Sequence, residues 1–281
     1  MTEFSASEAI GSGFRTMQRR PAAILAWAAA YFVGGVLPQG LLWAKLAPLM
    51  AARPVDPQAM AAAMSGMGAW APLMWLVGIV VSSVLYGAAF RAVLTPDDDR
   101  FLYLRLSRRE LWLGLTMLAI VILFLVGSLI TAVVIGLVGR NLPGVVVFLL
   151  ALACIGGFIW LAMRFSLATV MAFAQSRFVF SQTWSLTAGH ALKLSGVALA
   201  VLCIMIGIEM AVILPIGLAL GFSGALRGLS AGAPPQPGQM LPWIAVFCIG
   251  VSLFGAVIIA VAGSPWASIY RQLVGADEAA A

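Results

Sequence analysis

A single carboxyl group stands in the apolar segment IMIGIEMAVILPIG (204–217), at Glu209. Ionisable side chains inside a membrane are rare and commonly bind ions or relay protons, so Glu209 is a candidate for ligand binding or ion coupling. Hydroxyl groups at a comparable estimated depth in other apolar segments could hydrogen-bond to it. These further candidates are Ser82, Ser83, Ser128, Thr131 and Ser252.

Three states of Glu209 agree with this setting. It can be neutral, because burial disfavours the charged form of a carboxyl group. It can accept hydrogen bonds from facing helices, or it can face a water-filled cavity. A charged residue at mid-helix costs about 2.5–3.5 kcal/mol on insertion, which neighbouring Leu, Ile and Val residues offset at about 0.3–0.6 kcal/mol each. Because no second acid or cation is expected at that depth, we favour a neutral or hydrogen-bonded packing group over a proton relay.

The remaining reactive side chains do not form a recognisable catalytic or metal-binding set. The aspartates 97–99 carry the oxygen ligands that divalent cations prefer, but three successive residues do not face one point. His190, the only histidine, has no acid or cysteine near it in the sequence. The cysteines lie inside apolar runs without metal-type spacing, at Cys154, Cys203 and Cys248. We therefore expect no catalytic residue, no metal, no cofactor and no enzymatic activity.

The composition indicates that lipid is the solvent for much of the chain. Of its 281 residues, 63% are hydrophobic and only 9% are charged, whereas a soluble domain has roughly 25% charged residues. Runs of about 20 apolar residues are long enough to cross a membrane as helices. Six such spans are predicted, at about 22–44, 70–94, 111–138, 145–163, 194–221 and 242–264. They predict an all-α integral membrane protein that forms a single membrane domain over residues 1–281.

Basic residues in the predicted loops indicate the orientation, because cytoplasmic loops carry an excess of Lys and Arg. Twelve Lys and Arg residues lie on one side and four on the other. This predicts a multi-pass protein of the bacterial inner membrane with both termini in the cytoplasm, including a tail at 265–281. The second, fourth and sixth spans each end in an arginine that suits the negative end of a helix dipole, at Arg91, Arg164 and Arg271. The net charge of +6 follows from these loop residues and gives no reason to expect a nucleic-acid partner.

The N-terminal segment 1–20 is predicted to contain a cytoplasmic amphipathic helix over 5–20. Ser5 and Glu8 have the spacing of a capping box. Apolar side chains recur at helical intervals at Ala6, Ile10, Phe14 and Met17, and basic ones follow at Arg15, Arg19 and Arg20. Such a helix is expected to lie on an anionic membrane surface, either as a lipid or partner sensor or as a plain anchor.

Two further patterns predict helix starts at the cytoplasmic face. Ser107 and Glu110 in SRRE (107–110) have capping-box spacing and open the third span. The segment 164–196, too polar to cross a membrane, is predicted to form two short interfacial helices between spans four and five. Ser181 can cap the second of these helices and Gly189 can end it, and Trp184 is expected at the level of the lipid headgroups.

The segment SQTWSLTAGHALKLSG (181–196) resembles the signature of a bacterial family of six-helix inner-membrane proteins. That family includes the membrane domain attached to some glycerophosphodiester phosphodiesterases. The matching residues are Ser181, Trp184, Leu186, Thr187, Gly189 and Gly196. YLRL (103–106) and IYRQL (269–273) also resemble parts of this family, whereas Thr169 stands where a proline is expected. The resemblance implies a six-helix inner-membrane protein, and it implies no reaction because no phosphodiesterase domain follows the sixth span.

Together these patterns predict a non-catalytic polytopic inner-membrane protein with a scaffolding, regulatory or lipid-organising role. Its working surface would be the cytoplasmic face, with anionic membrane lipids as partners. The membrane-interface residues of this prediction are Arg15, Arg19, Arg20, Arg91, Arg164, Trp184 and Arg271. The alternative is a small-solute or proton-coupled transporter or channel that uses Glu209.

Overall fold

The computed structural model describes residues 4–41, 57–222 and 237–275, and every regular element within these ranges is a helix. The α-helices are α1 (Ala6–Arg19), α2 (Pro21–Tyr31), α4 (Pro57–Leu94), α5 (Arg108–Val138), α6 (Gly144–Arg164), α7 (Ala168–Gln175), α8 (Phe180–Leu186), α9 (Ala191–Phe222) and α11 (Pro237–Val274). The π-helix η1 (Phe32–Val36) continues α2, and the short 3-10 helices η2 (Arg100–Tyr103) and η3 (Gly139–Asn141) lie in turns.

Six helical segments are long and apolar enough to cross a membrane, and each overlaps one of the six predicted spans. Residues 42–44 of the first predicted span lie outside the described residues. Two helices extend more than five residues beyond one end of their predicted spans. α4 begins at Pro57 and passes Pro72 without ending. α11 continues to Val274, beyond the predicted end at 264, because the first part of the predicted tail is apolar and packs in the core, as Tyr270 shows.

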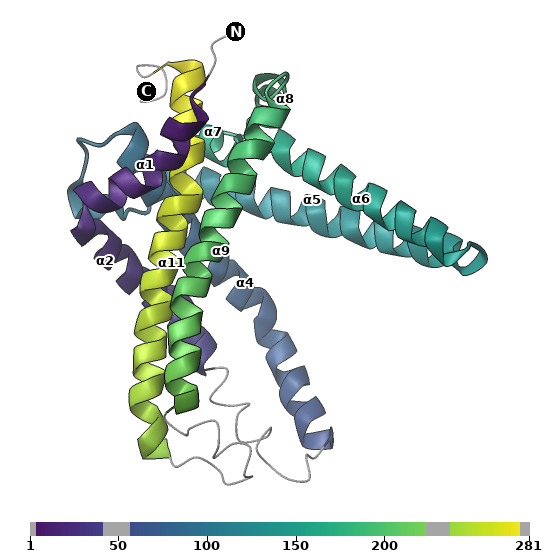
Figure 1. Ribbon diagram of the computed structural model, residues 1–281, viewed down its shortest axis with the longest axis horizontal. Helices are drawn as coiled ribbons and strands as arrows, with labels where there is room; N and C mark the ends of the chain where they lie inside the picture. The colour runs from purple at the N-terminus through teal and green to yellow at the C-terminus, as the bar shows by residue number, and fades with distance from the viewer. Residues whose placement is uncertain (1–3, 42–56, 223–236, 276–281) are drawn as a thin grey trace.

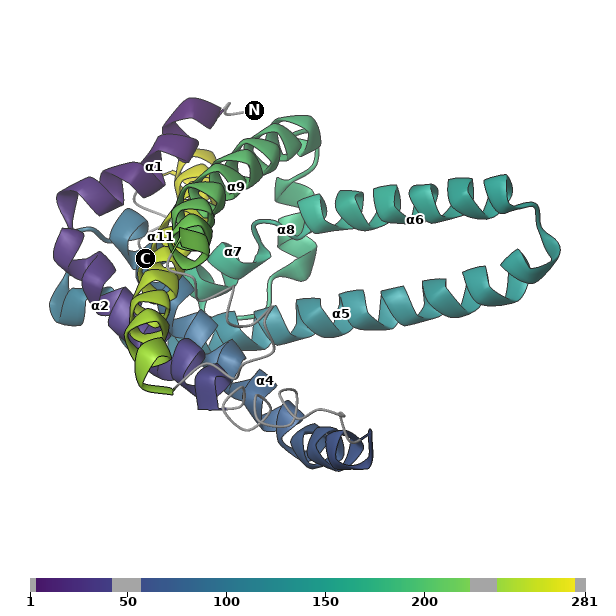
Figure 2. The same cartoon turned by 60° about the horizontal axis from the view of Figure 1, so that its bottom comes forward.

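The helices do not form one parallel bundle. Figure 1 shows α9 and α11 side by side, α4 inclined to them, and the α5–α6 hairpin projecting sideways from the other helices. Figure 2 shows the same hairpin from another direction, again clear of the other helices along most of its length. The hairpin is joined to the rest mainly through α5, which packs on α4 and α7, and also through contacts of α6 with α9. Its most apolar stretches have no buried residue, as expected for helices that lipid surrounds.

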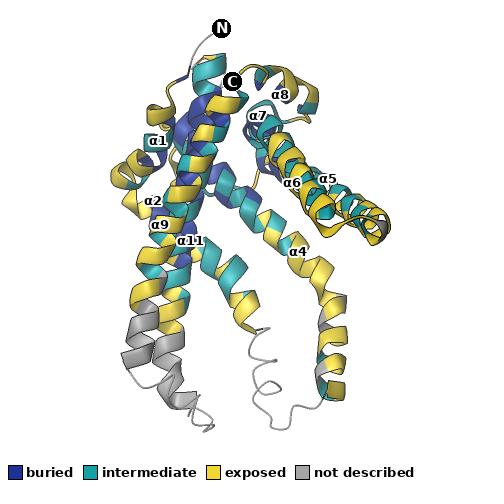
Figure 3. Ribbon diagram, turned by 45° about the vertical axis from the view of Figure 1, so that its right-hand side comes forward, coloured by how far each residue is buried: buried dark blue, intermediate teal, exposed yellow. Residues whose placement is uncertain are grey.

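The buried core lies toward the end of the molecule where the N- and C-termini lie, as the dark blue segments in Figure 3 show. One cluster of buried side chains includes Phe90, Leu113, Phe173, Leu194 and Tyr270. A second includes Trp27, Leu85, Tyr103 and Ala260. Because these clusters join α1, α2, α4, α5, α7, α9 and α11, this end of the molecule is the part in which packing holds side chains in fixed positions.

Helix α1, which was predicted to lie on the membrane through its apolar stripe, packs on α11 mainly through small residues. Its buried residues are Ala9, Ser12, Gly13 and Thr16. A Cβ atom on Gly13 would lie only 2.8 Å from the carbonyl oxygen of Ala260. Small side chains let two helices approach closely, so they decide which face is buried. Phe14, from the predicted stripe, is exposed instead, and Ile10 and Met17 are partly buried.

The predicted helix starts have three outcomes. The Ser107–Glu110 capping box is present in both of its halves and is confirmed. The hydroxyl oxygen of Ser5 accepts a hydrogen bond from the Glu8 backbone N–H at 3.3 Å, which confirms the cap of α1. The prediction for Ser181 was wrong, because α8 begins one residue earlier, at Phe180, and has no side-chain cap. Gly189 does follow the helix in a left-handed conformation, with φ of 82°.

Candidate functional site at the basic face

The end of the molecule that holds both described chain ends is rich in arginine, and we call it the basic face. It comprises α1, Arg20 between α1 and α2, the end of α4, the turn 95–107 and the start of α5. It also includes the end of α6, the short helices α7 and α8, and the end of α11. Arg91, Arg164 and Arg271 lie in the last turns of α4, α6 and α11, as predicted. The backbone N–H of Ser5 donates to the side-chain oxygen of Gln272 at 2.7 Å, which brings the two chain ends together.

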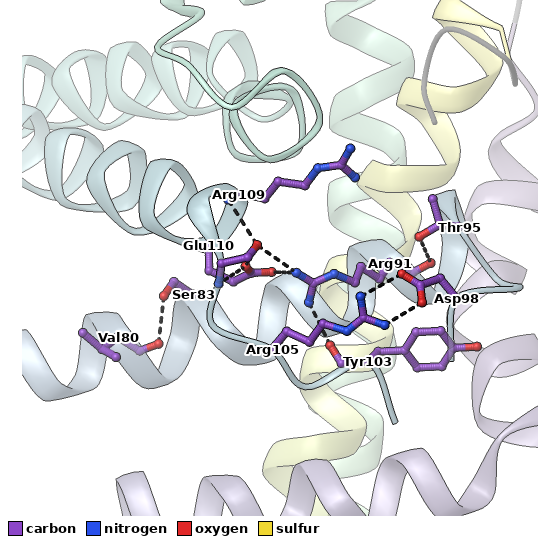
Figure 4. A network of polar contacts seen from close by, with 10 residues as sticks. Val80, Ser83, Arg91, Thr95, Asp98, Tyr103, Arg105, Arg109 and Glu110 are labelled. Carbon is purple, nitrogen blue, oxygen red and sulfur yellow. Dashed lines mark hydrogen bonds and ion pairs between the residues drawn. The ribbon is translucent and has the colours of Figure 1, made fainter. Parts of the chain in front are cut away.

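A buried ion pair between Arg91 and Glu110 joins the end of α4 to the start of α5 beneath this face (Figure 4). The Arg91 side chain is 5% exposed and that of Glu110 is 0% exposed. Arg91 Nη1 also donates to the carbonyl oxygen of Tyr103 at 2.9 Å, and its guanidinium lies 5.4 Å from the centre of the Phe173 ring. Removing one partner of such a pair leaves a buried charge without compensation, so the pair ties α4, the turn and α5 together.

Local sequence explains how Glu110 reaches this position. The Glu110 carboxylate completes the capping box by accepting from the Ser107 backbone N–H at 2.8 Å and from the Ser107 hydroxyl at 2.5 Å. Arg91 Nη2 in turn donates to the Ser107 hydroxyl oxygen at 3.3 Å. Gly87, one turn before Arg91, leaves room for the carboxylate, since a Cβ atom there would lie 2.9 Å from Glu110 Oε1. Glu110 therefore caps the start of α5 and also neutralises the charge of Arg91 at the end of α4.

The three aspartates of the turn do not converge on one point. Asp98 forms a paired contact with Arg105, with distances of 2.5 and 2.8 Å between their oxygen and nitrogen atoms. Asp99 pairs with Arg20 at 2.7 Å. Asp97 lies at a separate pocket beside α1. The hydrogen bond from Arg105 holds the pKa of the Asp98 carboxyl below its usual value of 3.8. Within the described ranges, no three His, Cys, Asp or Glu residues gather where they could hold a metal ion.

The same turn contains a left-handed stretch of backbone. Phe101, Leu102 and Tyr103 have φ values of 53°, 55° and 69°. Such conformations cost non-glycine residues about 1–2 kcal/mol each and persist only where surrounding contacts impose them. The contacts here are the hydrogen bond from Arg91 to Tyr103 O and one from Trp27 Nε1 to Leu102 O at 3.0 Å. They leave Phe101 81% exposed at the basic face.

A second arginine is held between two tryptophans. The guanidinium of Arg164 lies 5.4 Å from the ring centre of Trp160 and 5.2 Å from that of Trp184. The hydroxyl of Thr187 makes its shortest hydrogen bond to the Thr183 carbonyl oxygen, at 2.9 Å, and also lies 3.3 Å from the Arg164 carbonyl oxygen. Trp184 and Thr187 are two of the residues that carry the family resemblance. Their contacts show that they fasten the turn around α8 to the end of α6.

The structure does not bring Glu209 together with the serines considered above. Glu209 is exposed on α9. Three of the four serine hydroxyls donate to a carbonyl of their own helix: Ser83 to Val80, Ser128 to Leu125 and Ser252 to Cys248. Ser82 lines an apolar cavity of about 720 Å³ between η1, α4 and α11, and Glu209 is not among the described residues that line it. Among the described residues, no hydrogen bond or ion pair joins Glu209 to any of these candidates.

The sequence patterns identified Arg91 and Glu110 separately and missed their pairing. Arg91 was assigned to the membrane interface and Glu110 to a helix cap. One feature of the sequence could have indicated the pairing. An arginine in the last turn of one span and an acid in the first turn of the next lie at the same membrane face. A short intervening turn brings two such helix ends close together, although it does not say which side chains will meet.

The fold and the basic face are those of an all-helical molecule with arginines gathered at one end. The chain is all-helical in its described ranges, has six helices long and apolar enough to cross a membrane, and carries short helices and paired arginines at one end. No family model, curated protein or solved structure matches the chain.

Proposed function

We propose that the chain is a bacterial inner-membrane protein whose basic face lies in the cytoplasm and has a non-catalytic scaffolding, regulatory or lipid-organising role. The observation that carries this proposal is the concentration of arginines at one packed end of the molecule. Cytoplasmic loops are enriched in Lys and Arg. An anionic leaflet attracts each such residue near its surface by about 1 kcal/mol.

A non-catalytic role is supported by what the acidic and imidazole groups of this face contact. Glu110, Asp98 and Asp99 are each engaged by an arginine. The His190 ring packs edge-on against Phe4, with ring centres 6.0 Å apart. A general acid or base has to present its proton-carrying atom to a substrate, whereas these groups hold helices and turns in place.

The resemblance of 181–196 to the six-helix membrane family agrees with this proposal. The motif residues Trp184 and Thr187 contact Arg164 and so fix the short helices against the end of α6. In that reading, the motif builds the cytoplasmic end of the protein. It does not itself bind a substrate.

Photo-crosslinking tests the proposed working surface. A photoreactive amino acid would replace exposed Phe101 at the basic face or, as a control, exposed Leu129 on α5. Phe101 is expected to capture one protein or anionic lipid reproducibly in intact membranes, and Leu129 only acyl chains. The same mixture of products from both positions would contradict the proposal.

Cysteine labelling tests the proposed orientation. Ser7 is exposed at the basic face and Gly66 is exposed near the opposite end of α4. In a background without the native cysteines, a membrane-impermeant reagent added to intact cells should label Gly66→Cys and spare Ser7→Cys. The reverse pattern would overturn the assignment of the basic face to the cytoplasm.

The alternative function is transport coupled to Glu209. One observation favours transport as such, without involving Glu209: the 720 Å³ cavity is lined partly by the π-helix η1, and π-helical turns occur frequently at functional sites. Wild type and Glu209→Gln would be compared for proton or solute flux in liposomes. A flux that Glu209→Gln abolishes would establish coupling, and equal flux, or none from either protein, would remove it.

A further inference from the structure

A second pocket, of about 330 Å³, lies at the basic face between α1, the end of α4 and the end of α11. One wall is formed by the polar side of α1, and the opposite wall by the turn after α4 and by Arg271 of α11. Its charged lining residues are Arg15, Arg19, Arg20, Arg271 and Asp97. Four guanidinium groups against one carboxylate give this pocket a strongly positive character, and none of the sequence patterns identified it as a pocket.

Structural contacts fix three of these arginines without using all of their donors. Arg15 Nη2 donates to Glu8 O at 2.8 Å, and Arg271 Nη1 donates to Val93 O at 2.9 Å. Arg20 Nη1 is paired with Asp99 at 2.7 Å. A guanidinium has five N–H donors. Each of these side chains is thus oriented by one contact and retains donors that a bound anion could accept.

Arg19 differs from the other three. The described part of the chain provides no hydrogen-bond or ion-pair partner for its guanidinium, although the side chain lines the pocket. The hydroxyls of Ser12 and Thr16 in the pocket wall already donate to carbonyls of α1, at 2.6 and 3.1 Å. The donors that remain for a ligand are therefore those of arginine.

We propose that this pocket binds the phosphate group of an anionic ligand, with Arg19 as its main dedicated contact. Guanidinium groups match the geometry of phosphate oxygens and bind them through paired, charge-assisted hydrogen bonds. The volume is at the lower end for ligand pockets, so it accommodates a phosphate with a glycerol-sized group and excludes acyl chains. The ligand is an anionic lipid headgroup or a soluble phosphate ester. This inference rests on the proposed lipid-organising function and gives that function a site.

Lipid retention by the full-length protein tests the proposal. Purified protein in detergent would receive phosphatidylglycerol or phosphatidylcholine, and native mass spectrometry would count the lipids that stay bound. Arg19→Gln would be compared with Arg108→Gln, which removes the same charge from an exposed residue of the basic face that does not line the pocket. We expect Arg19→Gln to weaken phosphatidylglycerol retention roughly tenfold, as the loss of one charge-assisted hydrogen bond does, and Arg108→Gln to behave as wild type.

Two outcomes separate the pocket proposal from the broader lipid-organising function, and a competition experiment identifies the source of the phosphate. If Arg19→Gln keeps the wild-type preference for phosphatidylglycerol, the pocket proposal is overturned and the lipid-organising function stands. If wild type itself shows no preference for phosphatidylglycerol over phosphatidylcholine, the lipid-organising function fails. Competition with glycerol 3-phosphate distinguishes the two sources of phosphate. Displacement of the lipid by this compound, in wild type and not in Arg19→Gln, would support a soluble ester as ligand of the same site.

Discussion

Arg91 and Glu110 form a buried ion pair although they belong to different helices and each has another role at its own helix end. Arg91 lies at the end of α4, and Glu110 caps the start of α5. The pair therefore stands where the projecting α5–α6 hairpin joins the rest of the molecule (Figure 4).

Breaking this pair should destabilise the protein strongly. Arg91→Met or Glu110→Gln is expected to lower the free energy of unfolding by about 3–5 kcal/mol, because the remaining partner stays buried without its counter-charge. Thermal unfolding in detergent measures the effect. The double variant Arg91→Met/Glu110→Gln should lose less than the sum of the two single variants, and strict additivity would show that the two groups are not coupled.

Gly87 should be intolerant of a methyl group. Gly87→Ala places a Cβ atom 2.9 Å from Glu110 Oε1, whereas Gly78→Ala on the same helix meets no atom within 4 Å. Alanine favours a helix over glycine by about 1 kcal/mol, but overpacking costs about 1–3 kcal/mol. We expect a lower melting temperature for Gly87→Ala and an unchanged or higher one for Gly78→Ala. Equal shifts for the two variants would count against the close contact.

Gly13 should determine whether α1 is docked. Gly13→Ala directs a Cβ atom at the Ala260 backbone, which cannot move aside, whereas Gly11→Ala meets only the flexible end of the Arg15 side chain at 3.1 Å. We expect faster amide hydrogen exchange across α1 in Gly13→Ala and no acceleration in Gly11→Ala. Protection of α1 that is the same in both variants would argue against docking through this face.

Phe101 offers a stabilising substitution. Its side chain is exposed and its φ is 53°, so Phe101→Asn loses little packing and introduces a residue that tolerates the left-handed region. We expect a gain of up to about 1 kcal/mol in unfolding free energy in detergent. Leu106→Asn is the control, because Leu106 is also exposed and has no positive φ. A loss of stability in Phe101→Asn alone would indicate that the phenyl ring has a partner.

Asp98 should contribute to stability in a pH-dependent way. Its pKa is lowered in the folded protein by the hydrogen bond from Arg105, so the folded state binds fewer protons than the unfolded state. The contribution is present above the ordinary pKa of 3.8 and is lost as the pH falls through the lower, folded value. Melting temperatures of wild type and Asp98→Asn should therefore converge in acid. The pair is exposed, so the effect is small, and a difference that grows in acid would contradict the assignment.

The parts of the fold that depend on local sequence could be predicted. Six apolar runs predicted six long helices, and the Ser5 and Ser107 caps mark two helix starts in the structure. These features follow from a residue and its near neighbours, so no knowledge of the tertiary structure is needed. The end of α11 was predicted too early because Tyr270 and its neighbours are buried by α1, which follows from tertiary packing.

The candidate site depends on which helices approach one another, and for that reason much of it could not be predicted. Arg91 was placed at the correct helix end, but its pairing with Glu110 depends on the path of the turn 95–107. The apolar stripe of α1 suggested a lipid-facing anchor, whereas the small residues around Gly13 decide how closely α11 approaches. Glu209 was singled out as a charge in an apolar segment, but three of its expected partners, Ser83, Ser128 and Ser252, are hydrogen-bonded within their own helices.

The docking of α1 on α11 has a consequence for the order of biosynthesis. Gly13 of α1 packs against the backbone of Ala260 in α11, and the Ser5 backbone N–H donates to the Gln272 side chain. α11 follows all other described helices along the chain, so a ribosome makes the partner of α1 after every one of them. Throughout translation of the intervening segments, the small-residue side of α1 has no native surface to bind. A helix with an exposed Phe14 and several arginines is of the amphipathic kind that binds membrane surfaces, and such binding would hold α1 until α11 has been made.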